Sequence, residues 1–556
     1  MTDIEGSFLA HYFADFLARR TPLEDAGRKS FMALVARLVQ AMEGGHSCLA
    51  LGPDDLAVLE PLMDSPVVSD KKQQRKTPLI VACQNLYLYR YDHYETRLAR
   101  NITALAAAQA APPPGDLTRK LDELFGGNSG GGNYQRYAAQ VASRKSLTII
   151  SGGPGTGKTT TVVKILALIL DVEKRRLKIA LGAPTGKAAM RLSESVRASL
   201  DRLESVRKIL ENIPASASTL HRMLGVKRNS PRFVHNAANP MTWDVVVVDE
   251  ASMVDLAMMC KLVDALKPGA KLILLGDKDQ LASVESGAVL ADLITALPEN
   301  SVELKTTYRF DRNIKRFAEM INRGDLGGCW QMAEDAQITN LALLSGGAGS
   351  CLGKSYERYM HLAGKCDGED EQTIRRLFQA FNSFQVLCAV RYGGRGEEAI
   401  NLSIEKWLAA KGYDCRPGGW YHGRPVLITR NDYTLELYNG DVGICLKGAD
   451  GRFRVWFERF DSGLRSYSPN RLVQLQTVYA MTIHKSQGSE FTEVVVVLPE
   501  EDSRILSREL VYTAVTRARE QVWIHSSREI LGCALGRTAV RQSGLCKRID
   551  SGRTSG

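Results

Sequence analysis

The sequence predicts an α/β fold with two mostly parallel sheets, a small β insertion and a mainly helical N-terminal domain. The apolar run 147–150 precedes a Gly-rich loop, and an apolar helical pattern follows at 162–170. Val245–Val248 and Leu272–Leu275 are continuous apolar runs, which are typical of strands covered on both faces. Similar runs return in the second half of the chain and predict a second sheet from 386–390, 425–429, 494–498 and 521–524.

Changes in composition predict the domain boundaries. Residues 1–110 show helical spacing and carry no chemical motif, and a Pro-rich and then Gly-rich stretch at 111–133 reads as a linker. The remaining units are a first α/β domain at 134–330, a second at 331–440 and 474–545, a β insertion at 441–473, and a tail at 546–556 whose polar end from Ser551 is expected to be disordered.

Composition narrows the class of protein without deciding it. The chain has 556 residues, a net charge of +10 and a pI near 9.0, which permit binding to a polyanion but do not prove it. No apolar run approaches the roughly 18 residues of a membrane span, and the acidic N-terminus lacks a signal-peptide core, so we expect a cytoplasmic protein. The eleven cysteines are scattered without a C-x-x-C pair, which predicts free thiols.

The Gly-rich loop matches G-x-x-x-x-G-K-[ST] between a strand and a helix, the order that a phosphate-binding loop requires. Its glycines let several backbone N–H groups face one phosphate, and the helix N-terminus adds partial positive charge. Lys158 should reach the β- and γ-phosphates, and the Thr159 hydroxyl should bind Mg²⁺. The predicted nucleotide-binding residues are Gly152, Gly153, Pro154, Gly155, Thr156, Gly157, Lys158, Thr159 and Thr160.

Two carboxylates, Asp249 and Glu250, directly follow the strand at 245–248. Ligands of open parallel sheets bind at this end of the strands, so Asp249 is expected to hold Mg²⁺ and Glu250 to orient or deprotonate water. Gln280 follows the next strand and is a candidate γ-phosphate contact, and Arg309 is a candidate contact to the nucleotide.

Polar motifs far along the chain predict that a second lobe completes the nucleotide site. Residues 482–491 precede a buried strand, and residues 511–519 are predicted to begin a helix. Arg517 is the candidate arginine finger that would stabilise transition-state charge from the second lobe.

Nine motifs occur in the order found in superfamily 1 helicases, and most closely resemble the RecD family, the alpha subunits of exodeoxyribonuclease V. They span about residues 133–525 and read GGPGTGKTTT, APTGKAAMRL, STLHRMLG, VVDEASMVD, LLGDKDQL, TYRF, YNGDVG, TIHKSQGSEF and VYTAVTRAR. The resemblance implies two RecA-like motor domains of the P-loop NTPase class, with ATP and Mg²⁺ as ligands.

The resemblance also assigns residues. Gln135 corresponds to the glutamine that reads adenine, and Gln280, Arg309 and Arg517 correspond to γ-phosphate sensors. Gly488 and Glu490 fall in a motif near both nucleotide and DNA. The positions that line the single-strand channel are Pro184, Thr185, Thr219, His221, Thr482, His484 and Lys485.

The function implied is an ATP-driven 5′→3′ motor on single-stranded DNA, acting at duplex ends in a heterotrimer with RecB-like and RecC-like subunits. Such a complex serves double-strand break repair, recombination and DNA degradation, with the nuclease in a partner. Residues 86–95 resemble the family's partner-docking domain, although the tyrosines by themselves favour a packed core element.

Two alternatives remain open at this point. One is a stand-alone superfamily 1 5′→3′ helicase that works without RecB or RecC, and the other is a nucleotide switch subunit that does not translocate. The presence of Arg309, Gln487 and Arg517 argues against a switch, because a switch subunit could lose its second lobe's catalytic residues.

Overall fold

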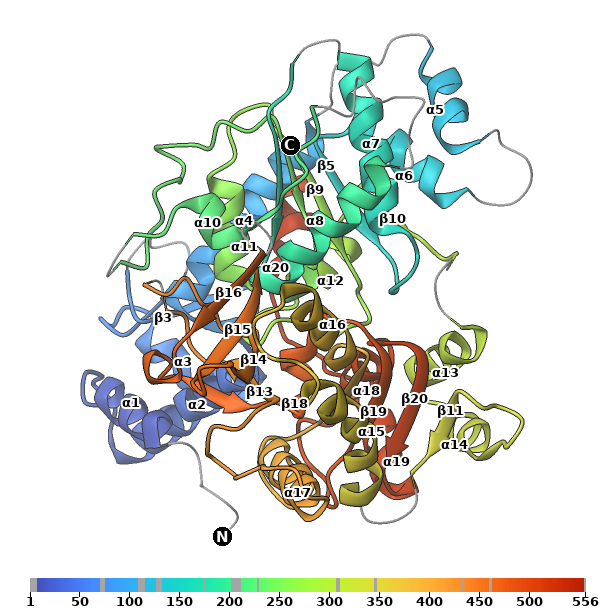
Figure 1. Ribbon diagram of the computed structural model, residues 1–556. Coiled ribbons are helices and arrows are strands. Elements are labelled where there is room, and N and C mark those ends of the chain that lie inside the picture. The colour runs from blue at the N-terminus through green and yellow to red at the C-terminus, as the bar shows by residue number, and fades with distance from the viewer. Residues whose placement is uncertain are drawn as a thin grey trace.

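The computed structural model describes residues 8–70, 76–108, 116–126, 133–173, 176–201, 212–227, 230–306, 311–344, 348–432, 434–459 and 463–554. Two α/β lobes lie one above the other, and a small β-sheet and the N-terminal domain lie beside them (Figure 1). The two predicted parallel sheets are confirmed. No helix in these ranges is long and apolar enough to cross a membrane.

The first lobe contains a six-stranded parallel sheet in the order β10-β5-β9-β8-β6-β7. Its strands are β5 Leu147–Ser151, β6 Ile179–Ala183, β7 Ser218–Thr219, β8 Val245–Val248, β9 Lys271–Gly276 and β10 Ser301–Glu303. The helices are α6 Tyr134–Arg144, α7 Lys158–Glu173, α8 Gly186–Leu200, α10 Leu220–Leu224, α11 Leu256–Asp264 and α12 Val289–Ala296.

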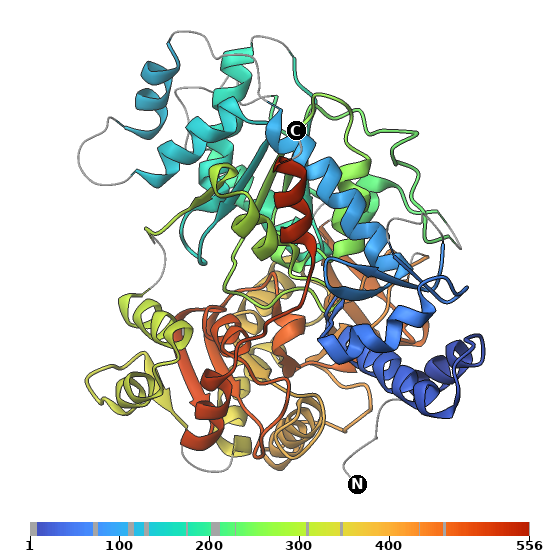
Figure 2. The ribbon, with the colours of Figure 1, turned by 180° about the vertical axis from the view of Figure 1, so that it is seen from behind.

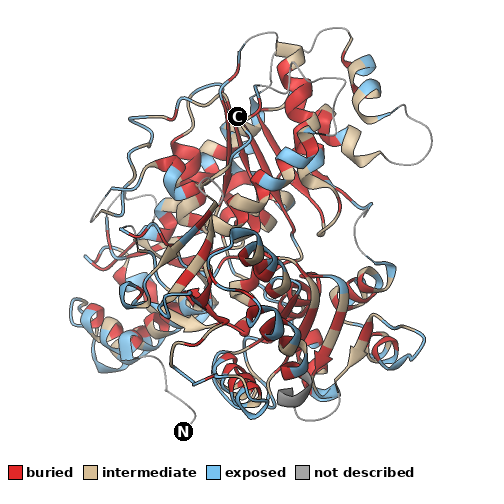
Figure 3. Cartoon of the chain, viewed as in Figure 1, coloured by how far each residue is buried: buried red, intermediate tan, exposed pale blue. Residues whose placement is uncertain are grey.

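Alternate residues of these strands belong to two separate cores, which explains the unbroken apolar runs. Val245 and Val247 pack with α6 and α7, whereas Val246 and Val248 pack with α11 and α12. Strands covered on both faces need no polar side, and Figure 3 shows the sheet buried along its length.

The second lobe has a five-stranded parallel sheet in the order β11-β20-β19-β12-β18. Its strands are β11 Leu341–Leu343, β12 Phe384–Cys388, β18 Ala480–Thr482, β19 Phe491–Val497 and β20 Ala518–His525. Its helices are α13 Arg312–Arg323, α14 Leu326–Glu334, α15 Ala348–Ala363, α16 Glu371–Phe381, α17 Glu397–Ala410, α18 Arg508–Val515 and α19 Arg528–Gly536. The helix expected at 511–519 ends at Val515, because the chain then turns into strand β20, which lies between β11 and β19.

The β insertion is larger than the predicted 441–473. It is a five-stranded antiparallel sheet made of β13 Arg424–Ile428, β14 Val442–Lys447, β15 Phe453–Arg459, β16 Gly463–Tyr467 and β17 Leu475–Thr477. The prediction placed 425–429 in the second parallel sheet, but β13 pairs with β14 and β17 around a core that includes Val426, Cys445 and Phe457. An apolar run identifies a buried strand but not the strand beside it.

The N-terminal domain combines helices with a four-stranded sheet, β1-β4-β3-β2. Its elements are α1 Phe8–Ala18, α2 Asp25–Glu43, β1 Leu49–Ala50, α3 Pro53–Leu59, β2 Val68–Asp70, β3 Leu79–Ala82, β4 Asn85–Leu88 and α4 Tyr89–Ala107. Tyr87 and Tyr91 are buried, as the packed-core interpretation of the tyrosines expects. Helix α4 packs on α11 and shares its core with β8 and β9, so residues 1–110 are not separated from the first lobe.

Two segments predicted to be irregular are helical. Within the expected linker, α5 Leu117–Phe125 packs on α6 and α7 through buried Leu117 and Leu121. The expectation of disorder from Ser551 is wrong as far as Thr554, because α20 Leu545–Thr554 packs on α4 and α12 (Figure 2). Short 3₁₀ turns lie at Glu60–Leu62, Ala251–Met253, Pro298–Asn300, Pro469–Arg471 and Ile483–Ser486.

Candidate nucleotide and DNA site

The Gly-rich loop, residues 152–159 and hereafter the phosphate loop, leaves β5 and enters α7, as predicted. Gly155 and Gly157 have φ values of 74° and 77°, which side chains other than glycine rarely adopt. A Cβ at Gly152 would lie 2.8 Å from Thr156 Oγ1 and 3.0 Å from the Leu304 carbonyl oxygen. The tight wrap therefore depends on glycine at these positions.

Side chains of the loop close around its own backbone. The Lys158 ammonium donates to the carbonyl oxygens of Gly152 and Gly153 at 2.6 and 3.1 Å, so its charge lies inside the curve of the loop. Thr156 Oγ1 donates to the Gly153 carbonyl at 2.8 Å, and Gln135 Nε2 lies 3.5 Å from the Thr156 carbonyl oxygen. Pro154 and Thr159 are partly exposed and Thr160 is exposed at the start of α7. A cationic cradle beside a helix N-terminus fits a phosphate chain.

Asp249 and Glu250 leave the sheet two strands from the Gly-rich loop. Burial, together with the nearby Glu250 carboxylate, raises the pKa of Asp249 to about 6, while Lys158 opposes that rise. The backbone N–H of Glu250 donates to Asp249 Oδ1 at 2.9 Å, and Glu250 itself has a φ of 51°. The half-buried Asp249 carboxylate near the Lys158 charge, with the Thr159 hydroxyl, is a donor set that suits Mg²⁺ on a nucleotide.

A third carboxylate, Asp277, was not assigned a role from the sequence. It directly follows β9, the strand between β5 and β8, and is 2 % exposed. Its Oδ2 accepts hydrogen bonds from Gln280 Nε2 and from the Tyr512 hydroxyl, both at 3.0 Å. Its position at the end of a buried strand, the same signal that identified Asp249, could have found it.

The loop 277–281, hereafter the seam loop, joins the two lobes. The Arg517 guanidinium donates to Gln280 Oε1 at 2.6 Å, and the backbone N–H of Leu281 donates to Thr513 Oγ1 at 2.9 Å. Gln487 Nε2 donates to the Leu281 carbonyl at 3.0 Å. The structure therefore brings Gln280 and Arg517 together, although 236 positions lie between them in the sequence.

Arg517 is buried at 2 % exposure and all its nitrogens bond to protein acceptors. Besides Gln280, its acceptors are the carbonyl oxygens of Thr513 and Ser489, at 3.1 and 3.2 Å. Arg309, the other predicted arginine contact, lies outside the described residues.

Gly488 and Glu490 both contact α8, the helix that follows β6. Gly488 has a φ of 72°, and a Cβ there would lie 3.2 Å from the Ala188 Cβ. The Glu490 carboxylate pairs with Arg191 of α8 at 2.7 Å and with Arg519 of β20 at 3.0 Å. Glu490 thus links the lobes by charge.

The residues predicted to line a DNA channel lie at strand ends of both lobes. Thr185 and Thr219 cap α8 and α10 by accepting from backbone N–H groups, and His221 packs edge-on against Phe233. Pro184 follows β6, and Thr482 ends β18. Burial lowers the pKa of His484.

Lys485 was expected to offer its amine to phosphate. Its Nζ lies 2.9 Å from both carboxylate oxygens of Glu397, which is 1 % exposed at the start of α17. An ammonium paired with a buried carboxylate has fewer protons left for a phosphate.

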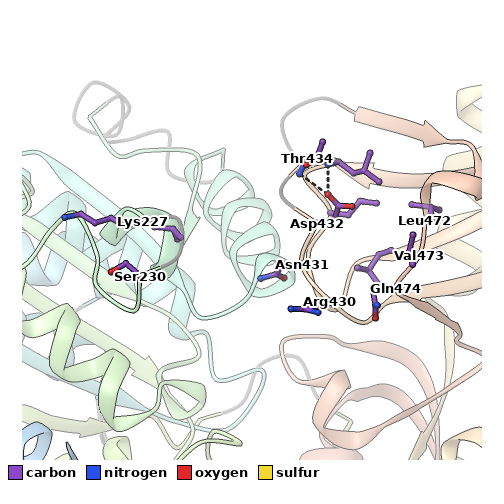
Figure 4. A pocket seen from close by; sticks show the side chains of 13 residues that line it. Lys227, Ser230, Arg430, Asn431, Asp432, Thr434, Leu472, Val473 and Gln474 are labelled. Atoms are coloured by element: carbon purple, nitrogen blue, oxygen red, sulfur yellow. Dashed lines mark hydrogen bonds between the residues drawn. The ribbon is translucent and has the colours of Figure 1, made fainter.

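A pocket of about 880 Å³ lies between the first lobe and the small sheet. Lys227 and Ser230 lie on the side of the first lobe and Arg430, Asn431 and Gln474 on the other, as Figure 4 shows. At its base, backbone N–H groups of Thr434 and Leu435 donate to Asp432 Oδ1. Beside it, Arg222 of α10 bonds to the Tyr438 hydroxyl. The basic residues Lys227 and Arg430 were not singled out from the sequence, since lone cations give no periodic signal.

Known families match both lobes. The AAA domain family matches residues 135–286, and the UvrD-like helicase C-terminal domain family matches residues 477–525. The RecBCD enzyme subunit RecD of Mycolicibacterium smegmatis is 39% identical over 570 residues, which cover 96% of each chain.

The chain belongs to the RecD family. The RecBCD enzyme subunit RecD of Haemophilus influenzae is 35% identical over 84% of this chain and 80% of its own. The ATP-dependent RecD2 DNA helicase of Deinococcus radiodurans is 29% identical over 99% of this chain and 72% of its own. This RecD-family chain is a superfamily 1, ATP-dependent DNA helicase.

Proposed function

We propose that this chain is the ATP-driven 5′→3′ translocase subunit of an exodeoxyribonuclease V complex. The observation that carries the proposal is the seam loop, which starts beside the phosphate loop. It accepts hydrogen bonds from Tyr512 and Arg517 of the second lobe and donates one to Thr513 of the same lobe. A site shared by two lobes lets hydrolysis change the distance between them, which is what a translocating motor requires.

The residues present fit ATP with Mg²⁺. Lys158 and the N–H groups of the loop would hold the β- and γ-phosphates, and Gln135 would face the adenine. Thr159 and Asp249 would hold Mg²⁺, which supplies charge neutralisation on the phosphates when bound.

The remaining predicted residues would act on the reaction itself. Glu250 would orient the attacking water, and Gln280, Arg309 and Arg517 would contact the γ-phosphate. Gly488 and Glu490 would lie near both ligands and would couple nucleotide binding to contacts with the DNA.

A single DNA strand would run across both lobes at their strand ends. The hydroxyls of Thr185, Thr219 and Thr482 suit phosphate oxygens, and His221 and His484 suit stacking or hydrogen bonding. Pro184 and Lys485 would complete the channel, with Lys485 held by Glu397. The pocket with Lys227 and Arg430 lies beside this route and suits the same polyanion.

Partner docking is assigned to the N-terminal domain. Helix α1 exposes the apolar side chains Phe8, Leu9, Tyr12 and Phe16, of which Phe8 is 83% exposed. Clustered exposed apolar side chains favour a protein interface, and we place a RecC-like subunit there, with a RecB-like subunit completing a cytoplasmic heterotrimer that acts at duplex DNA ends.

The first experiment is steady-state ATP turnover of the purified chain with and without single-stranded oligonucleotide. Lys158→Ala serves as the blank, and Lys145→Ala makes the same chemical change at a surface ion pair with Glu299. Strong DNA stimulation, lost only in Lys158→Ala, is the expected result. Absence of stimulation in both the isolated chain and the co-purified complex would refute the motor and favour the nucleotide switch.

A partner-free helicase is the second candidate, because the chain also matches the RecD2 DNA helicase over 99% of its length. Strand displacement on a 5′-tailed duplex separates the two candidates. Unwinding by the chain alone favours a stand-alone enzyme. Loss of complex assembly in Phe8→Ser/Tyr12→Ser, but not in the exposed control Tyr392→Ser, favours the subunit.

A further inference from the structure

Two buried side chains beside the phosphate loop have no assigned role. Asp277 follows β9 in the first lobe, and Tyr512 lies on α18 in the second. The Tyr512 hydroxyl lies 3.0 Å from Asp277 Oδ2. A Cβ added to Gly153 would lie 3.1 Å from the same hydroxyl, so Tyr512 lies directly against the phosphate loop.

The chemistry of the donors fixes the direction of this hydrogen-bond network. An ionised carboxylate only accepts, so Tyr512 must donate its proton to Asp277, and Gln280 must turn its NH₂ group toward the other side of the same oxygen. Gln280 then has only its carbonyl oxygen left, and this oxygen accepts from Arg517 at 2.6 Å. Asp277 therefore determines which end of the Gln280 amide faces the arginine.

Two hydrogen bonds of the network cross from the second lobe to the first, so they form only when the lobes are in contact. Tyr512 lies on α18 and Arg517 in the turn that follows this helix. They bond to Asp277 and Gln280, which are three positions apart in the seam loop. If the second lobe moves away, both bonds break together. If Asp277 loses its acceptor, the Gln280 amide is free to turn and Arg517 loses a fixed partner.

We propose that Asp277 and Tyr512 are a positioning pair for ATP turnover: together they orient Gln280 and Arg517 at the contact between the two lobes. The proposal rests on the proposed ATP-driven function, and it concerns the step after nucleotide binding. Neither side chain is assigned to the reacting atoms.

The test is Tyr512→Phe in the full chain, which removes one hydroxyl and keeps the buried ring. We expect kcat for DNA-stimulated ATP turnover to fall about tenfold, since a hydrogen bond to a charged group is lost, while the Kd of a non-hydrolysable ATP analogue stays within about twofold. The matched control is Tyr359→Phe, which removes another buried hydroxyl of the same lobe, bonded at 2.8 Å to the Gly423 carbonyl, and should leave kcat unchanged.

Asp277→Asn and the double variant complete the experiment. The introduced amide keeps the size of the Asp277 side chain but brings donors that compete with Tyr512 and Gln280, so kcat should fall at least as far as in Tyr512→Phe. Because the two residues share one bond, the double variant should be no slower than the slower single variant.

Either of two results would overturn the pair. Tyr512→Phe could keep the kcat of the wild type or match Tyr359→Phe, or the two single effects could multiply in the double variant. If Tyr512→Phe fails to fold, Asp277→Asn with the same kcat and Kd readouts decides the matter. Failure of the proposed function itself would appear separately, as absence of ATP turnover in the wild type.

Discussion

The phosphate loop and the seam loop are neighbours, but they are held in different ways. They follow the adjacent strands β5 and β9, and the backbone N–H of Gly152 donates to the Gly276 carbonyl oxygen at 3.1 Å. The phosphate loop bonds mainly to itself, through Lys158 and Thr156. The seam loop bonds to residues of the other lobe, including Thr513 and Arg517.

The difference separates binding from coupling. A loop that closes on its own backbone keeps its shape whatever the second lobe does, so it suits ATP binding. A loop held across a lobe boundary changes when the lobes move, so it suits control of turnover. Loss of the Lys158 ammonium, which closes the first loop, should therefore abolish turnover outright, whereas changes at the contacts between the lobes should slow turnover at normal affinity.

The largest effect is expected for Lys158→Ala. Removal of the ammonium takes away the cation nearest the phosphates, so ATP turnover should fall to background while the fold is kept. Turnover and circular dichroism measured together check this. Retained turnover would show that the phosphate site is elsewhere.

Arg517→Ala should have the next largest effect. The kcat should fall about 10³-fold, as for other arginine fingers, with ATP-analogue affinity nearly unchanged. Arg517→Lys should not restore the rate, because a lysine cannot reach three separate acceptors at once. A fall in affinity with normal turnover of bound ATP would contradict the finger role.

A smaller effect is expected where the two loops meet. In Gly153→Ala the new methyl group would lie 3.1 Å from the Tyr512 hydroxyl, so kcat should fall about tenfold or less while analogue affinity changes little. Gly536→Ala, where nothing lies within 4 Å, is the control. Equal behaviour of the two variants would mean that Tyr512 does not press on the phosphate loop.

The smallest effect concerns stability of the seam loop. Burial and the Asp277 charge raise the pKa of Asp279 to about 6. The folded state thus holds this proton more tightly than the unfolded chain, and that stabilisation is lost as pH rises from about 4 to about 6. Asp279→Asn should raise the free energy of unfolding by about 1 kcal/mol at pH 8, after a discount for partial exposure.

Thermal unfolding at pH 8 and at pH 5 measures this difference. The gain in Asp279→Asn should shrink at pH 5, where wild-type Asp279 is largely protonated. A gain that is the same at both values would mean that the charge of Asp279 costs the fold nothing.

Residue type and spacing were sufficient to predict the parts of the molecule that a few neighbouring residues determine. The phosphate loop, the acids after β8 and the buried parallel strands each follow from a few neighbouring positions, because backbone geometry and two-sided burial act at short range. The order of the motifs along the chain is by itself enough to indicate the family.

Features that depend on long-range pairing became visible only in the folded chain. In the structure β13 pairs within the small sheet, and α20 is a packed helix. Lys485 pairs with Glu397, and Asp277 contacts Tyr512 across 234 intervening positions. None of these contacts produces a periodic pattern in the sequence, because the partner of a side chain depends on which elements pack together in the folded chain. The contacts that couple the two lobes belong to this second class, and so no pattern of neighbouring residues could have predicted them.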